Sequence, residues 1–304
     1  MVIVDLLAPL FLLIVLGAVL HRVGLLPAEV IGPLNRLLYW VGLPVVVFHS
    51  LAVAEPVAGQ VGPLLGLLLL ATAVSIGLAW GWSLLLRVPP RGRGTFVQAA
   101  FRGNLSYIGL PLLLSVPGLP RAAAVLSMAP MLIVYNAVSV AWLLASRGDR
   151  QSGGRVVLRE IARNPIILAS LAGAAWHYLG WPLSTPVQRI LRTIAEMSLP
   201  LALLMIGAAL LMFPLRGNLR AATVASLHKV ALSPLAGYVI GRWWGLDGGT
   251  LLAALLCLAC PTAAVSYTMS RQFEGDEALA AAAVVLSALL AMPALALILA
   301  VFTV

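Results

Sequence analysis

The feature that most constrains the fold is a series of apolar stretches, each about 20 residues long, that recur along nearly the whole chain. A helix of about 20 apolar residues crosses a bilayer core about 30 Å thick. The chain is 62% hydrophobic and 10% charged, a composition that soluble domains do not have. We therefore expect an all-α integral membrane protein, because a helix satisfies its backbone polar groups within one segment.

Charged and Pro/Gly-rich connections divide the apolar sequence into ten expected spans. They cover roughly residues 5–25, 31–53, 61–86, 94–116, 120–146, 160–180, 187–212, 219–243, 249–271 and 276–303. The first is expected to be a true span and not a cleaved signal peptide, because Asp5 precedes it instead of a basic stretch. The longest polar connection, Arg147 to Arg163, separates five spans from five.

The arginines in the connections predict the orientation of the chain. The odd-numbered connections carry 12 arginines and the even-numbered ones carry four. The positive-inside rule then places the odd connections in the cytoplasm and both termini on the non-cytoplasmic side of the cell (inner) membrane. The net charge of +9 is explained in the same way, and no clustered basic segment with interleaved aromatic residues indicates a nucleic-acid partner.

An odd number of spans in each half gives the two halves opposite orientations, as in an inverted repeat. We expect a first five-helix repeat over residues 1–147, a cytoplasmic linker over 148–159 and a second repeat over 160–304. Weak internal similarity supports the repeat. Arg36 precedes Leu43-Pro44 by the spacing at which Arg192 precedes Leu199-Pro200.

The fourth and ninth spans are interrupted in the middle by residues that break helices. Gly103 to Pro111 reads Gly-Asn-Leu-Ser-Tyr-Ile-Gly-Leu-Pro, and Ala259 to Tyr267 reads Ala-Cys-Pro-Thr-Ala-Ala-Val-Ser-Tyr. Proline removes a backbone donor, and Gly tolerates dihedrals that other residues avoid. Unwound backbone at membrane depth must be buried in protein or line a wet cavity, because each unsatisfied amide costs several kcal/mol in lipid. Matching breaks in two halves indicate a transporter's binding site.

Free amides and the positive ends of half-helices stabilise an anion, so these breaks predict a site for a carboxylate. Gly109, Pro111 and Pro261 mark the expected crossing of the two broken spans. The polar residues around the breaks either contact the substrate or replace lost backbone hydrogen bonds, and His49 either lines the site or packs in the core. The candidate substrate contacts are Asn104, Ser106, Tyr107, Pro261, Thr262, Ser266 and His49.

Three charged residues inside the expected spans are candidates for a role in transport. Glu196 and Lys229 require a partner or a wet cavity. Either they serve proton coupling or a conformational latch, or they form a static buried ion pair or extend to the membrane surface. Arg102 either attracts a second carboxylate or extends its side chain to the cytoplasmic face. We expect an otherwise neutral crossover, in which amides and helix dipoles hold the anion and a bound cation does not.

Several segments together resemble the auxin efflux carrier family, which includes the plant PIN proteins and bacterial permeases. The resemblance covers the whole length. The chain lacks the long cytoplasmic loop of the plant members and is therefore similar to the short-loop bacterial members. The matching segments are Leu34-Asn35-Arg36 with Leu43-Pro44 and Phe48-His49-Ser50, then Asn104 to Pro111, Pro200 to Ala208, and Pro261 with Gly275 and Pro293.

This resemblance implies ten helices in two inverted five-helix repeats, with the broken fourth and ninth helices crossing as in the bile-acid symporters. It also implies a scaffold from spans 1, 2, 6 and 7, a moving transport domain from spans 3–5 and 8–10, and a homodimer formed through the scaffold. The substrates it implies are small organic anions such as auxin, malate or malonate, with Asn104 on the carboxylate.

The alternative is a sodium- or proton-coupled symporter of the bile-acid-carrier type. An intramembrane enzyme is not expected, because the chain has no paired catalytic aspartates and no His-Glu-x-x-His helix. No cofactor or metal is expected. Cys257 and Cys260 lie at helical spacing in one span and predict helix packing.

Overall fold

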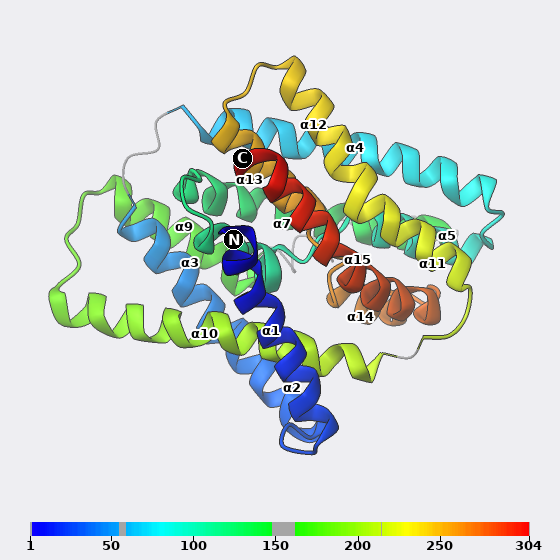
Figure 1. The fold of residues 1–304 in the computed structure, drawn as a ribbon, viewed down its shortest axis with the longest axis horizontal. Helices are drawn as coiled ribbons and strands as arrows, with labels where there is room; N and C mark the ends of the chain where they lie inside the picture. Colours follow the sequence, from blue (N-terminus) through cyan, green and yellow to red (C-terminus); the bar gives the residue numbers. More distant parts are fainter. Residues whose placement is uncertain (1, 55–58, 148–161, 214, 304) are drawn as a thin grey trace.

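The computed structural model describes residues 2–54, 59–147, 162–213 and 215–303. The described residues are helical and form no β-strand (Figure 1). The expected linker 148–159 lies outside them. The elements are α1 (Val2–Arg22), α2 (Ala28–Leu37), η1 (Leu38–Gly42), α3 (Leu43–Ala52), α4 (Val61–Leu85), α5 (Pro90–Phe101), η2 (Leu105–Gly109), α6 (Leu110–Ser115), α7 (Arg121–Arg147), α9 (Pro165–Tyr178), α10 (Thr185–Met212), α11 (Leu219–Leu227), η3 (His228–Leu232), α12 (Ser233–Trp243), α13 (Gly248–Ala259), α14 (Val265–Gln272) and α15 (Glu277–Thr303).

Long apolar helices make the chain a multi-pass membrane protein. In the described part, five helical stretches are long and apolar enough to cross a membrane. Three shorter apolar helices add to them, and two of these are halves of the interrupted spans: Leu105–Ser115 and Gly248–Ala259. The interruption explains why neither half reaches the length of a full span. The five long stretches are Ala28–Ala52, Val61–Leu85, Arg121–Ser146, Thr185–Met212 and Glu277–Phe302.

The helices pack in two groups. In the first, α1 lies along α10, and α3 packs against both α9 and α10. In the second, α4, α5 and α7 pack together, α12 packs on α4 and α13, and α11 packs on α15. Figure 1 shows α1, α2 and α10 on one side of the molecule and α4, α11 and α12 on the other. The groups meet where α10 contacts η2 and where α7 contacts α9.

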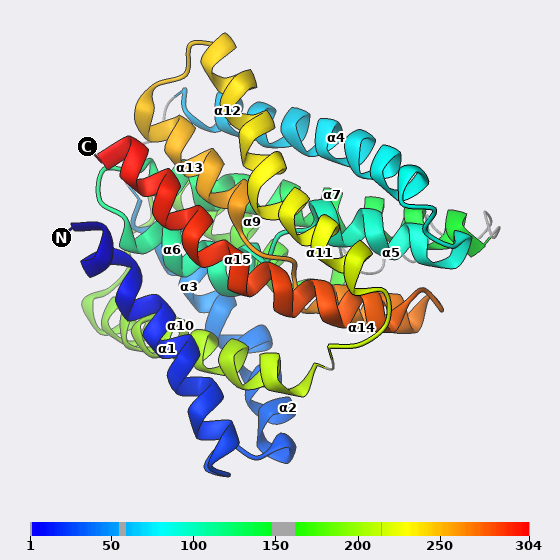
Figure 2. The ribbon, with the colours of Figure 1, turned by 45° about the vertical axis from the view of Figure 1, so that its right-hand side comes forward.

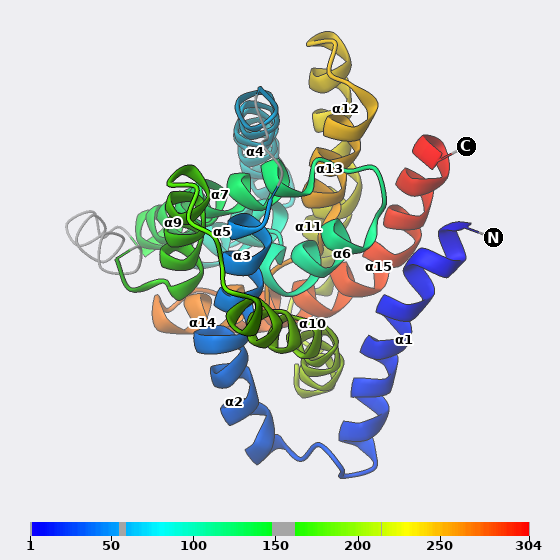
Figure 3. The same cartoon turned by 90° about the vertical axis from the view of Figure 1, so that its left-hand side faces the viewer.

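Glycines allow α1 and α10 to approach closely. A Cβ atom added to Gly17 would collide with the backbone of Leu204, and one added to Gly207 would collide with the backbone of Ile14. Small residues are the usual way in which membrane helices pack backbone to backbone, since lipid gives no hydrophobic drive for association. The beginning of α1 and the end of α15 also lie near each other (Figures 2 and 3).

Each of the three π-helical turns precedes a proline. In η1, η2 and η3 the residue before Pro44, Pro111 or Pro234 donates its N–H to the carbonyl five residues back. Proline has no N–H, and its ring clashes with the carbonyl four residues back. A wider turn relieves that clash, and such turns are frequent at functional sites. Two of them, η1 and η2, contribute residues to the cavity described below.

Candidate functional site

The two interrupted segments cross and pair with each other. The Asn104 N–H donates to the carbonyl of Pro261 at 2.8 Å, and the Ala263 N–H donates to the carbonyl of Arg102 at 3.0 Å. Gly103 and Thr262 face each other in an isolated antiparallel bridge. We call residues 102–104 and 260–264 together the crossover. The pairing satisfies backbone groups that would otherwise be orphaned inside the membrane.

Side chains satisfy further backbone groups at the crossover. The Thr262 hydroxyl donates to the carbonyl of Ala99 at 2.7 Å, and the Thr262 N–H donates to the Ser287 hydroxyl at 2.9 Å. The Asn104 side-chain oxygen accepts a bond from the Tyr107 N–H at 3.4 Å. Both Thr262 and Asn104 therefore perform the structural role that the sequence left open.

Two glycines let the segments meet. An added Cβ on Gly103 would lie 3.3 Å from Lys229 Cε and 3.4 Å from Cys260 Cβ, and one on Gly109 would lie 3.2 Å from Cys260 Sγ. Gly109 thus lies against Cys260 of the other broken segment. Pro111 is buried in the first turn of α6, and it does not line the cavity.

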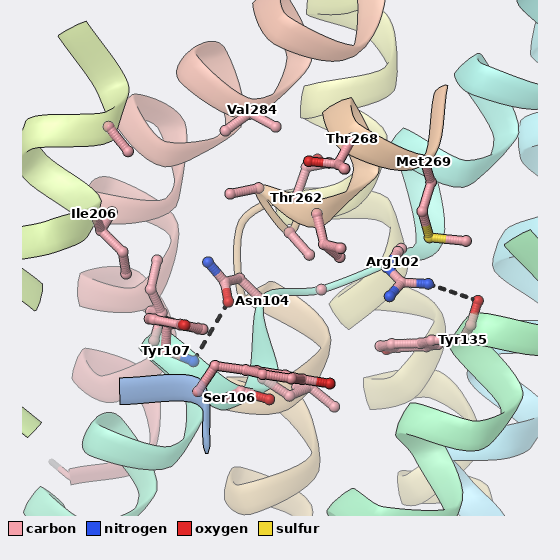
Figure 4. Close-up of a pocket in the computed structure, with 18 of the residues that line it drawn as sticks. Arg102, Asn104, Ser106, Tyr107, Tyr135, Ile206, Thr262, Thr268, Met269 and Val284 are labelled. Carbon is pink, nitrogen blue, oxygen red and sulfur yellow. Dashed lines mark hydrogen bonds between the residues drawn. The ribbon is translucent and has the colours of Figure 1, made fainter. Parts of the chain in front are cut away.

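A cavity of about 640 Å³ opens at the crossover, between the two helix groups (Figure 4). It is lined by most of the predicted contacts: Asn104, Ser106, Tyr107, Pro261 and Thr262. His49 and Ser266, also predicted as contacts, do not line it. Polar residues that we did not predict as contacts also line the cavity: Asn35, Arg36, Asn164, Thr268 and Gln272.

The orientation of α14 explains why Ser266 does not line the cavity. Ala264, Thr268 and Gln272 line the cavity at intervals of four residues, which is one face of a helix. Ser266 lies two residues from Ala264 and from Thr268, about 200° around the helix axis. Its side chain is accordingly buried away from the cavity. The four-residue spacing was visible in the sequence, but the position where the helix resumes was not.

Arg102 is fixed against α7 and faces the cavity. Its side chain is buried, and it donates to the carbonyl of Tyr135 at 2.9 Å, to the Ser139 hydroxyl at 3.1 Å and to the Asn136 side-chain oxygen at 2.6 Å. Of the two alternatives for Arg102, these contacts do not fit an extension to the cytoplasmic face. Figure 4 shows its guanidinium on the α7 side of the cavity. Arg102 and Asn104 lie two residues apart in the unwound segment, and both line the cavity.

The structure separates the other two charges. Glu196 accepts a 2.7 Å bond from Arg192 one turn away, and their side chains are 64% and 71% exposed. Lys229 is fully buried and donates to the carbonyl of Leu258. The alternative of a buried ion pair between Glu196 and Lys229 is therefore excluded. Arg102 belongs to the crossover and Lys229 lies against Gly103, so two cations lie where amides and helix dipoles were expected to hold the anion.

Comparison with known proteins decides the family. The sequence model of the membrane transport proteins matches residues 2–153 and 150–299. The chain belongs to the membrane transport protein family. This confirms the resemblance to the auxin efflux carriers and identifies a transporter, not an enzyme. A protein of Rhizobium meliloti (strain 1021) named “Putative malonate transporter” is 28% identical over 315 residues, which cover 95% of this chain and 92% of that protein.

The cavity of this membrane transport protein suits an anion. Arg36 and Arg102 line it, and none of its lining residues in the described part of the chain is acidic. Within the same part, no group of three or more His, Cys, Asp and Glu residues is placed to hold a metal ion. The helical turns that follow the crossover, η2 and α14, begin at the cavity. The N-terminal ends of helices favour negative charge, so the dipoles act in the same direction as the arginines.

Proposed function

We propose that the protein moves a small dicarboxylate of the malonate class across the membrane and binds it at the crossover. The observation that carries the proposal is that Asn104 and Arg102, two residues apart in unwound backbone, line one cavity without acidic lining residues among those described. The name of the Rhizobium relative supports malonate as the substrate to test first.

The two carboxylates of malonate find different partners. The oxygen of the Asn104 side chain already accepts the bond from Tyr107, which leaves the amide N–H₂ as the group to donate to a carboxylate. The N-terminal end of η2 adds its dipole at the same place. The second carboxylate, one methylene away, is attracted by the positive charge of Arg102.

We further propose that the chain forms ten spans in two inverted five-helix repeats, with residues 1–147 in the first and 160–304 in the second. The first packing group, α1 to α3 with α9 and α10, is the scaffold, through which two copies dimerise. The second group, α4 to α7 with α11 to α15, moves the crossover past it in an elevator-type cycle. The separation of the two packing groups supports this division. Both termini lie outside the cytoplasm, in accord with the neighbouring ends of α1 and α15.

The membrane potential alone can drive export. An anion that leaves a negative-inside cell gains about 2.3 kcal/mol per charge per 100 mV, or about 4.6 kcal/mol for a dianion. Uptake against that potential requires a coupled proton or sodium ion, as in the alternative bile-acid-type symporter. Malonate flux into proteoliposomes under an imposed sodium gradient, proton gradient or potential separates these mechanisms.

The binding site is tested with Asn104→Ala and a matched control. Asn218→Ala removes an asparagine that also caps a helix, with its side-chain oxygen on the Ala221 N–H at 3.0 Å, but Asn218 does not line the cavity. Loss of a hydrogen bond to a charged group costs about 1.5–3 kcal/mol, so Asn104→Ala should weaken malonate binding by about tenfold or more. Asn218→Ala should leave the affinity unchanged. Malonate affinities measured by thermal shift that are equal in native protein and Asn104→Ala refute the site.

A further inference from the structure

Lys229 is a buried cation at the crossover, and it is the one lysine in the chain. It lies in η3, which packs against α4, α5, α13 and α15. Its side chain has no exposed surface. An ammonium at membrane depth is costly unless polar atoms accept hydrogen bonds from it. Lys229 does not line the substrate cavity, so contact with the substrate does not explain why it is there.

The ammonium occupies the end of a broken helix. Leu258 lies in the last turn of α13, and its carbonyl accepts the bond from Lys229 Nζ. In an unbroken helix that carbonyl would bond the N–H of Thr262, but this N–H donates to the Ser287 hydroxyl. Lys229 therefore supplies the donor that the break removed.

The same side chain touches the other broken segment. Lys229 Cε lies 3.3 Å from the position of an added Cβ on Gly103. Gly103 pairs with Thr262 across the bridge, so the lysine lies behind the point at which both segments cross. Both α5 and α13 end at this point, and the C-terminal ends of helices carry partial negative charge.

Broken-helix transporters hold sodium with such groups, namely unwound carbonyls and the C-terminal ends of half-helices. An ammonium carries the same single charge and bonds the same oxygens. We propose that Lys229 is the resident cation of the crossover and occupies the place of a coupled sodium ion, so that an anion binds at the opposite, N-terminal side of the break without a metal cation. The binding part of this inference rests on the proposed function.

The first test needs neither substrate nor substitution. The thermal unfolding of the native protein is compared in sodium, potassium and choline chloride at equal ionic strength. Since a ligand that binds only the folded state stabilises it by mass action, an open sodium site would give a saturable rise specific to sodium. We expect identical unfolding temperatures in the three salts. A saturable sodium-specific rise overturns the proposal, whatever the substrate is.

The second test uses Lys229→Met, which keeps an unbranched stem and removes the charge. We expect malonate affinity to fall, because the variant removes the positive charge behind the break and leaves the Leu258 carbonyl without its donor. The control is Ser226→Ala in α11, which removes a buried donor to the carbonyls of Ala222 and Ala283 but no charge, at a position that does not line the cavity. It should bind malonate as the native protein does.

The two proposals fail in different ways. Native affinity in a folded Lys229→Met variant overturns the role of Lys229 while the proposed function stands. If the native protein binds no malonate, the proposed function fails, and the salt comparison still decides whether the sodium position is already occupied. If Lys229→Met does not yield folded protein by size-exclusion chromatography, the salt comparison decides alone.

Discussion

Gly207→Ala tests the close packing of α1 on α10. The added Cβ would overlap the backbone carbonyl of Ile14, and no side-chain rotation relieves a clash with backbone. Overpacking of this kind costs about 1–3 kcal/mol. Alanine is also the better helix former by at most about 1 kcal/mol. The net expectation is a loss of up to about 2 kcal/mol in the free energy of unfolding.

The matched control is Gly77→Ala on α4, where an added Cβ meets nothing within 4 Å. It keeps the gain in helix propensity without the clash, so its stability should equal or exceed that of the native protein. Thermal unfolding followed by the fluorescence of the eight tryptophans measures both. Equal unfolding temperatures for Gly207→Ala and Gly77→Ala would refute the packing argument. Malonate affinity should survive in Gly207→Ala, because Gly207 does not line the cavity.

Three further substitutions test the site and one helix end. Arg102→Gln should weaken malonate binding by about tenfold or more and acetate binding much less, since only the dianion has a second carboxylate for the guanidinium; equal losses in calorimetric titrations argue against that role. Thr262→Val keeps the side-chain shape but removes the donor to the Ala99 carbonyl, and should cost about 1–3 kcal/mol of stability in thermal unfolding; an unchanged unfolding temperature contradicts this. Hydrogen bonds from Thr250 lower the pKa of Asp247, the N-cap of α13, below its ordinary value of 3.8, so its contribution is present above that value and lost as the pH falls through the lowered pKa. Asp247→Ala should therefore cost about 1 kcal/mol at neutral pH and progressively less below pH 3.8, and a pH-independent cost would show that the charge is irrelevant.

The sequence was sufficient to predict the broken spans because their cause is local. Proline and glycine interrupt a helix wherever they fall, and an interruption at membrane depth must find polar partners. The expectation that the segments of Gly109 and Pro261 cross rests on that requirement together with the family resemblance. Family membership, too, could be inferred from short patterns spread over the chain, and the match over residues 2–153 and 150–299 confirms it.

The directions of individual side chains could not be predicted, because they depend on packing between distant segments. Arg102 faces α7 through Ser139 and Asn136, and no local pattern links these residues. The position of Lys229 could not be predicted, because it depends on the packing of η3 behind the crossover. Glu196, inside an apolar stretch, was expected to need a partner or a wet cavity, and α10 exposes it beside Arg192.

The antiparallel pairing at the crossover has a consequence for how such a carrier diversifies. The joint between the two halves is made by main-chain atoms of Arg102, Asn104, Pro261 and Ala263, which every amino acid except proline supplies at the donor positions. Under the proposed function, the joint and the recognition of the anion use different atoms of the same residues. A single substitution at position 104 or 102 would then change which anion is accepted while the main-chain pairing of the two broken segments remains intact.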